Sequence, residues 1–257
     1  MDPAPTDGSR LIIHGAPASQ PSRAVYWTCM IKRLPFELRP LGLGDMGPDS
    51  PLLRLNPTGQ VPIIEDGDFA VFEMPAILIY LCEKHGWDDL LPKDLHARTR
   101  VHQYLHHHHG FTRRVTMELM APHVTVAFAE RMKGTPIEPL IGDPQKLAKG
   151  RAVATRVAEL IEKGFFPDEA THLCGPHATI ADIACYEELA QLRWADLFDF
   201  EGFPTIQRWL REMEQLPFHE HAHRYNLVLG DVRTQANTME RFVEASVAGI
   251  TALADVA

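Results

Sequence analysis

The stretch from Asn56 to Leu81 constrains the fold most, because it has the pattern of a β-hairpin followed directly by a helix. The turn is Glu65-Asp66-Gly67-Asp68, in which Asp-Gly supplies a residue that tolerates positive φ. Apolar runs on both sides predict two short strands. Glu73-Met74-Pro75 then begins a helix, with Pro75 near the first position, where its missing N–H costs nothing.

The start of this stretch has the features of a peptide-binding edge. Pro62 opens the first strand, and a proline cannot donate to the ladder. A cis Val61–Pro62 bond would present the N–H and C=O of Val61 outward, where a small peptide can pair as an added strand. The helix after Glu73 offers free N–H groups and its dipole to a carboxylate. Glu73 can accept from an ammonium group, so the surface suits a ligand with a peptide backbone, a carboxylate and an amine.

In this order, Asn56-Pro57, Val61-Pro62, Asp66-Gly67 and Glu73-Met74 resemble the glutathione site of the soluble glutathione S-transferases. Residues 19–26 (Ser-Gln-Pro-Ser-Arg-Ala-Val-Tyr) are similar to the theta-class active-site segment, and residues 175–182 resemble the folding motif of the family. The run from Asn56 to Pro62 is also similar to the phi and beta classes. The resemblance extends over residues 10–230, most of the chain.

This resemblance implies an α/β plus all-α fold, with an N-terminal thioredoxin-like βαβ-ββα domain followed by an all-helical C-terminal domain. The expected division is an N-terminal tail at 1–9, a glutathione-binding domain at 10–86, a linker at 87–97, a helical electrophile-binding domain at 98–230 and a helical tail at 231–257 that closes as a lid.

The residue patterns agree with that order. Residues 11–14 and 36–41 are predicted strands, and 42–50 is a loop rich in Gly, Pro and Asp. Thr179 and Asp182 form a predicted capping box at a helix start. Helices are predicted over 22–32, 98–109, 115–133, 146–165, 179–195 and 203–215, with a loop at 134–144, and Phe242, Val243, Val247 and Ile250 predict one more helix whose apolar face covers the cleft.

Composition excludes several classes of protein. The chain has 257 residues, is 45% apolar and has a formal net charge of −9, which argues against a nucleic-acid partner. No apolar run reaches the roughly 18 residues of a membrane span, and the N-terminus lacks the pattern of a secretory signal. Its four cysteines have no CxxC spacing, which favours reduced thiols and a cytoplasmic location.

Ser19 is the predicted catalytic residue. A cysteine thiol has a pKa of about 8.5, so a glutathione-dependent enzyme must stabilise the thiolate. A hydroxyl that donates to the sulfur, beside a helix N-terminus, lowers that pKa. Ser19 stands between the first strand and the first helix; its alternative role is that of a simple N-cap. Ser22 is the rival hydroxyl, and Arg23 is expected to pair with a glutathione carboxylate or with a carboxylate between the domains.

By the same resemblance, the glutathione-binding residues are Gln60, Val61, Pro62, Glu73 and Met74. The family has serine where Met74 stands, and that serine caps the helix and binds the γ-glutamyl carboxylate. Met74 offers only its backbone N–H, so weaker glutathione binding is expected. The basic or amide residues that the family places in the 42–49 loop are also missing.

Histidines are the one biased feature of the chain. His102, His106 and His109 share a face at helical spacing, and His219, His221 and His223 form a second group. Neither group includes the thiolate or carboxylate usual in zinc sites, so no metal is expected. By resemblance, the first helix borders the electrophile pocket and a dimer interface, and His106, His109, Arg113 and Arg114 are the candidate pocket residues. Surface or dimer salt bridges are the alternative for the two arginines.

These observations predict a homodimeric glutathione transferase with glutathione as co-substrate. Its thiolate would attack small hydrophobic electrophiles such as alkyl halides, epoxides and activated aromatics, or reduce organic peroxides. The alternative is a protein of the same fold that binds glutathione or a hydrophobic ligand without turnover; Met74 and the altered loop favour it.

Overall fold

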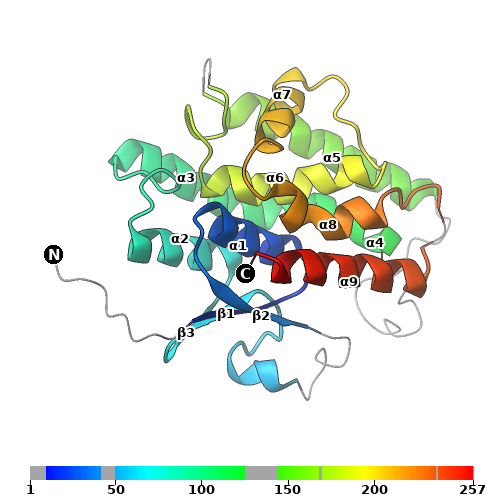
Figure 1. Cartoon of the computed structure of the whole chain (residues 1–257). Coiled ribbons are helices and arrows are strands. Elements are labelled where there is room, and N and C mark those ends of the chain that lie inside the picture. Colours follow the sequence, from blue (N-terminus) through cyan, green and yellow to red (C-terminus); the bar gives the residue numbers. More distant parts are fainter. Residues whose placement is uncertain (1–9, 42–49, 125–143, 168–169, 236, 257) are drawn as a thin grey trace.

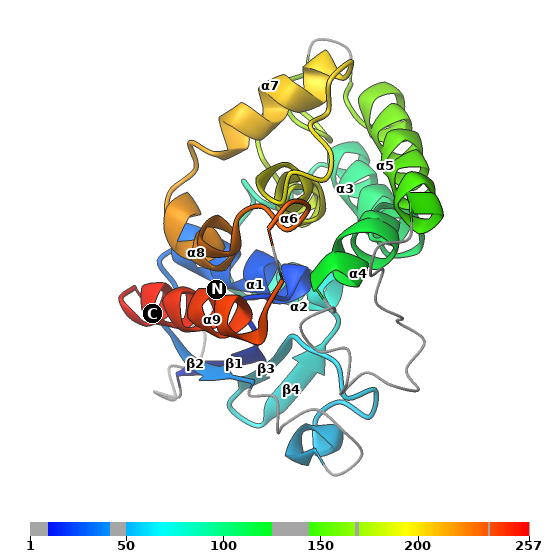
Figure 2. The ribbon, with the colours of Figure 1, turned by 90° about the vertical axis from the view of Figure 1, so that its right-hand side faces the viewer.

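The computed structural model describes residues 10–41, 50–124, 144–167, 170–235 and 237–256; the predicted tail at 1–9 and the loop at 42–49 lie outside them. The N-terminal part of the chain contains a four-stranded mixed sheet in the order β2-β1-β3-β4 (Figure 1; all four strands are labelled in Figure 2). β1 runs parallel to β2 and antiparallel to β3, and β3 and β4 form a hairpin. The strands are β1 Leu11–Gly15, β2 Phe36–Pro40, β3 Ile63–Asp66 and β4 Phe69–Phe72.

One face of this sheet is apolar and covered by two helices. Alternation along the strands places Leu11, Ile13, Phe36 and Ile64 in the core. The helices above them are α1 (Gln20–Ile31) and α2 (Met74–His85), which lie between the sheet and the rest of the molecule (Figure 2). The hairpin turns at Gly67 with a φ of 64°, as Asp-Gly predicts.

In the helical half, which is the part of the described chain after α2, the regular elements are helices, apart from an isolated β-bridge between His172 and Gly175. Helix α6 runs through the middle of this half and is buried along nearly its whole length (Figure 1). The α-helices are α3 Leu95–His107, α4 Ala121–Val124, α5 Pro144–Gly164, α6 Ile180–Trp194, α7 Pro204–Met213, α8 His219–Leu229 and α9 Met239–Ala254, with π-helical segments His108–Thr112 and Thr116–Met120 and a 3-10 turn Pro51–Arg54. The observed order is the thioredoxin-like unit followed by a helical half, as predicted.

The capping box at α6 is present. The Thr179 N–H donates to the Asp182 carboxylate at 2.9 Å, and the Thr179 hydroxyl accepts from the backbone of the first turn. The other Asp182 oxygen accepts from the Leu173 N–H at 2.8 Å and from the Trp209 indole at 3.0 Å. Asp182 therefore also fastens the preceding loop and α7 to the start of α6.

Two predicted helices differ from the structure, and one helix was not predicted. The predicted helix 98–109 is α-helical only to His107 and then widens into a π-helical segment. The predicted helix 115–133 begins as a second π-helical segment, and residues 125–143 lie outside the described chain. Helix α8 was not predicted. Its N-cap is Phe218, which has a φ of 60° and makes no side-chain capping bond.

Helix α9 forms where the tail predicts a helix, but with a different buried face. Ala245, Gly249 and Leu253 are its buried positions, whereas Val243 and Val247 are 47% and 57% exposed. The prediction that both valines cover the cleft is therefore wrong. A Cβ on Gly249 would lie 2.7 Å from the Pro17 side chain, so α9 packs tightly against the β1–α1 loop as well as against α8.

Within the described chain, no helix is both long and apolar enough to cross a membrane.

Candidate active site

Ser19 lies where the first strand passes into the first helix. It is the N-cap of α1, half-buried, with extended backbone angles (φ −84°, ψ 119°). Its Oγ accepts from the Ser22 N–H at 3.4 Å, which leaves the hydroxyl proton available to donate. The hydroxyl thus combines a hydrogen-bond donor with the positive end of a helix, as stabilisation of a thiolate requires.

Ser22 occupies a different environment. It is fully buried. Its Oγ lies beneath the end of β1, 2.8 Å from where a Cβ on Gly15 would be, and the Tyr26 hydroxyl lies beside it. Ser22 therefore faces the core behind the loop, and Ser19 is the better placed of the two hydroxyls.

Arg23 fastens the loop that carries Ser19. Its guanidinium is fully buried and donates to the carbonyls of Pro17 at 2.9 Å and Ala18 at 3.1 Å. Its Nε donates to Glu187 on α6 at 2.7 Å, and the other Glu187 oxygen lies 2.9 Å from His223 on α8. Arg23 pairs with a carboxylate of the helical half, one of the two partners that the sequence predicts.

The loop before β3 is held by Asn56. This buried side chain donates to the Gln60 carbonyl at 2.8 Å and accepts from the Thr58 N–H at 3.0 Å. The Val61–Pro62 bond is cis, and the strand begins only at Ile63. Among the described residues, Val61 makes no backbone hydrogen bond, so its N–H and C=O remain available to an added peptide strand.

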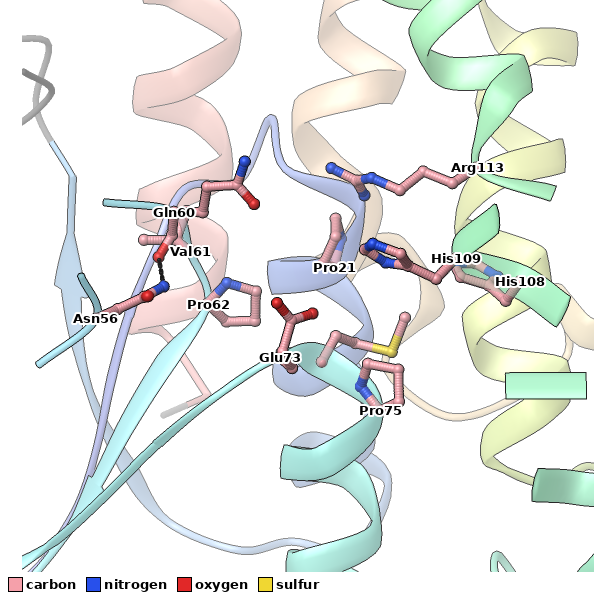
Figure 3. Close-up of a pocket in the computed structure, with 11 residues that line it drawn as sticks. Pro21, Asn56, Gln60, Val61, Pro62, Glu73, Pro75, His108, His109 and Arg113 are labelled. Atoms are coloured by element: carbon pink, nitrogen blue, oxygen red, sulfur yellow. Dashed lines mark hydrogen bonds between the residues drawn. The ribbon is translucent and has the colours of Figure 1, made fainter. Parts of the chain in front are cut away.

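Glu73 and Met74 begin helix α2. Glu73 is the N-cap, with a φ of 72° that non-glycine residues rarely adopt, and its side chain makes no capping bond. The exposed carboxylate reaches up into the cleft (Figure 3). Met74 is buried and contributes its backbone N–H to the helix start. The first turn of α2 therefore has free N–H groups for an anion, without the help of a hydroxyl.

A cleft that is partly open to solvent joins these parts to the helical half. His109 and Arg113 reach across it toward Pro21, above Glu73 (Figure 3). The lining residues are Pro21, Asn56, Gln60, Val61, Pro62, Glu73, Met74, Pro75, His108, His109 and Arg113. All five predicted glutathione-binding residues are thus in one cleft, together with two of the four predicted pocket residues.

The other two predicted pocket residues lie elsewhere. His106 is exposed and is not among the lining residues. Arg114 donates to Glu118 at 2.7 Å on the surface, which is the salt-bridge alternative. His108 lines the cleft but was missed, because an α-helical wheel places it off the face of His102, His106 and His109.

The second histidine group is structural. His219 and His223 pack edge-on against Trp27 of α1, at 5.6 and 4.7 Å between ring centroids. Burial lowers the pKa of His219 to about 3, so it is neutral at neutral pH. His221 is exposed. Among the described residues, no group of three or more histidine, cysteine or acidic side chains is arranged to hold a metal.

The environment of the four cysteines argues against a role as nucleophile. Cys29, Cys82, Cys174 and Cys185 are free and buried. Burial raises the pKa of all four thiols, those of Cys82 and Cys174 to about 12. Since the thiolate is the reactive form, none of these thiols supplies the nucleophile of the cleft.

Comparison with known proteins identifies the family. Residues 13–89 match the family described as glutathione S-transferase, N-terminal domain. Human glutathione S-transferase theta-1 is 35% identical over 199 residues, 76% of this chain and 79% of the relative. The chain belongs to the glutathione S-transferase family and is theta-like.

Solved structures show the same relationship. The apo form of human glutathione S-transferase T1-1 superimposes with a TM-score of 0.75 at 30% identity, covering 96% of this chain and all of that one. Human glutathione transferase theta-2, in complex with glutathione and an unknown ligand, gives a TM-score of 0.74 at 29% identity, covering 96% of this chain and 100% of that one.

Proposed function

We propose that this protein is a glutathione transferase in which Ser19 stabilises the thiolate of bound glutathione for attack on a small electrophile. The observation that carries the proposal is the position of Ser19: a hydroxyl with a free proton at the N-terminus of α1, two residues before Pro21, which lines the cleft with the peptide-pairing edge. Such a hydroxyl stabilises the charged sulfur by a hydrogen bond and by the dipole. The electrophile class is alkyl halides, epoxides, activated aromatics or organic peroxides.

Glutathione would lie along the cleft, with its cysteinyl backbone against Val61. Its γ-glutamyl end would meet Glu73 and the Met74 N–H at the start of α2, and Gln60 would contact its main chain. The glutathione complex of human theta-2 supports this assignment by relationship. The electrophile would enter between Pro21 and the opposite wall, where Arg113 and His109 offer a binding place for an anionic group.

The wider proposal keeps the expected organisation. Residues 10–86 would bind glutathione, 98–230 would bind the electrophile, and 231–257 would close over one side of the cleft. A homodimer in the cytoplasm is proposed from the family and from the four free cysteines, which suit a reducing compartment. Sedimentation at several protein concentrations tests the dimer.

The direct test of function is glutathione titration by calorimetry, followed by a panel of small electrophiles. We expect saturable binding and catalysed conjugation with at least one electrophile. Saturable binding without turnover on any of the four classes would favour the alternative, a non-catalytic binding protein on this fold.

A further inference from the structure

A buried carboxyl group lies directly behind the cleft wall. Glu188 is on α6, and its side chain is 1% exposed. One of its oxygens accepts from the Thr116 hydroxyl. The other, Oε1, lies 3.6 Å from Arg113 Nη1 and 3.7 Å from His108 Nε2, both too long for a hydrogen bond. Among the described residues, Oε1 and His108 Nε2 are thus two buried polar atoms without a hydrogen-bond partner.

The π-helical segment explains why these two groups converge on Glu188. The Arg113 N–H donates to the His108 carbonyl at 3.0 Å, five residues back. In an α-helix with 3.6 residues per turn, side chains five apart point about 140° away from each other. The wider π turn brings them closer to one side, and such turns occur frequently at functional sites. His108 and Arg113 therefore both face α6, although Arg113 still reaches the cleft with a side chain that is 28% exposed.

Burial and the neighbouring charges have opposing effects on the pKa of Glu188. Burial raises the pKa of Glu188 to about 7, although Arg113, Thr116 and Arg23 act to lower it. Burial and the nearby Arg113 lower the pKa of His108 to about 3, so this histidine is neutral. Burial raises the pKa values of Tyr104 and Cys185, which keeps both uncharged.

The remaining charged neighbours of Glu188, Arg23 and Glu187, form an ion pair with each other. Arg23 is bound to Glu187. Although burial acts to raise the pKa of Glu187, His223 and Arg23 outweigh it and hold that pKa below the usual range. Of the described residues that face Glu188, Arg113 is thus the one whose charge also faces the cleft, and His109 lies on the cleft side as well.

We propose that Glu188 is a positioning residue for Arg113 and takes up one proton from solvent when an anionic group of the electrophile binds the Arg113 guanidinium. This inference rests on the proposed function, because the anion must be carried by a molecule bound in the transferase cleft. When Glu188 is ionised, its charge offsets that of Arg113 at the wall. When Glu188 is protonated, the full charge of the guanidinium attracts the bound anion.

The coupling is reciprocal, since the anion favours the protonated form as much as protonation favours the anion. Anionic electrophiles should therefore bind more tightly as the pH falls through the neutral range, and neutral ones should not. Each unit by which the anion raises the Glu188 pKa corresponds to about a tenfold change in affinity.

The test compares two glutathione conjugates that differ in one charge, S-benzylglutathione and S-(4-sulfobenzyl)glutathione. The sulfonate stays ionised throughout the pH range. Calorimetry near neutral pH, in buffers with different ionisation enthalpies, counts the protons taken up on binding. We expect greater uptake with the sulfonate than with the neutral conjugate, and we expect the excess to disappear in acid, where Glu188 is already protonated.

Two variants assign the proton. Glu188→Gln should remove the excess uptake and the pH dependence of sulfonate affinity, whereas His106→Asn, at an exposed histidine outside the cleft lining, should keep both. Persistent excess uptake in Glu188→Gln, or its loss in His106→Asn, would overturn the proposal. Infrared difference spectra of the unaltered protein give a readout that does not depend on a variant folding. They should show a protonated carboxyl group gained only with the sulfonate, and no gain would count against Glu188.

The outcomes also separate the inference from the function on which it rests. If neither conjugate binds, the proposed glutathione site is wrong. If both bind with equal proton uptake, the glutathione site stands and the role of Glu188 is wrong.

Discussion

The ion pair between Arg23 and Glu187 should contribute much of the stability of the contact between the two halves. Arg23→Met retains an apolar stem but leaves Glu187 buried without its guanidinium, at a site where the side chains are 0% and 2% exposed. Removing one partner of a buried ion pair typically costs about 3–5 kcal/mol. The carbonyls of Pro17 and Ala18 also lose their donor. We therefore expect the free energy of unfolding to fall by about that amount.

The assay is equilibrium urea unfolding of Arg23→Met, Glu187→Gln and the double variant. Each single change leaves one member of the pair buried without the other, although Glu187 keeps its contact with His223, whereas the double variant removes both charges of the pair. The loss in the double variant should therefore be smaller than the sum of the two single losses, by about 0.5–3 kcal/mol. Additive losses, or a loss below about 1 kcal/mol in Arg23→Met, would refute the reasoning, since exposed pairs contribute only that much.

The same pair predicts a pH dependence. The pKa of Glu187 is lower in the folded protein than in the unfolded chain. Its contribution to stability is therefore complete at neutral pH, above the unfolded value of about 4.3, and is lost as the pH falls through the folded pKa. Glu187→Gln should remove this part of the acid sensitivity.

Two further predictions concern the cleft. Met74→Ser adds a hydroxyl at the start of α2 and should tighten glutathione binding by about 1 kcal/mol, measured by calorimetry; an unchanged or weaker affinity would show that another group already holds the γ-glutamyl carboxylate. Truncation after Gly230 removes α9 from beside Pro17 and should speed product release or admit bulkier electrophiles. Gly249→Ala should act in the same direction, because its Cβ would lie 2.7 Å from the Pro17 side chain. Unchanged turnover and substrate range in a folded truncation would end the lid hypothesis.

The parts predicted correctly from the sequence are those that local chemistry determines. Asp66-Gly67 forms its turn because glycine accepts positive φ, and Thr179 and Asp182 cap α6 because a hydroxyl and a carboxylate three residues apart satisfy free N–H groups. The glutathione-binding residues came from the resemblance, and Gln60, Val61 and Pro62 line one cleft. Ser19 caps α1 but is not among the lining residues, so its role as the catalytic hydroxyl stays a prediction.

The parts that were missed depend on tertiary packing. Helix α8 starts without a side-chain cap, in the polar run His219-Glu220-His221, and it is held by the packing of His219 and the buried His223 against Trp27. The π turn at His108 changes which side chains share a face, and helical periodicity assumes a regular turn. The sequence signal for His108 was its spacing of five residues from Arg113. That spacing has meaning only once Glu188 is known to lie beside both side chains.

The most direct test of the central claim is the thiol pKa of bound glutathione, followed by the ultraviolet absorbance of the thiolate as the pH is varied. The account predicts a value well below that of a free thiol, about 8.5, in the unaltered protein and in Ser22→Ala, and a return toward the free value in Ser19→Ala, with conjugation reduced by orders of magnitude. A depressed pKa that survives in Ser19→Ala, or that is lost in Ser22→Ala alone, would contradict it.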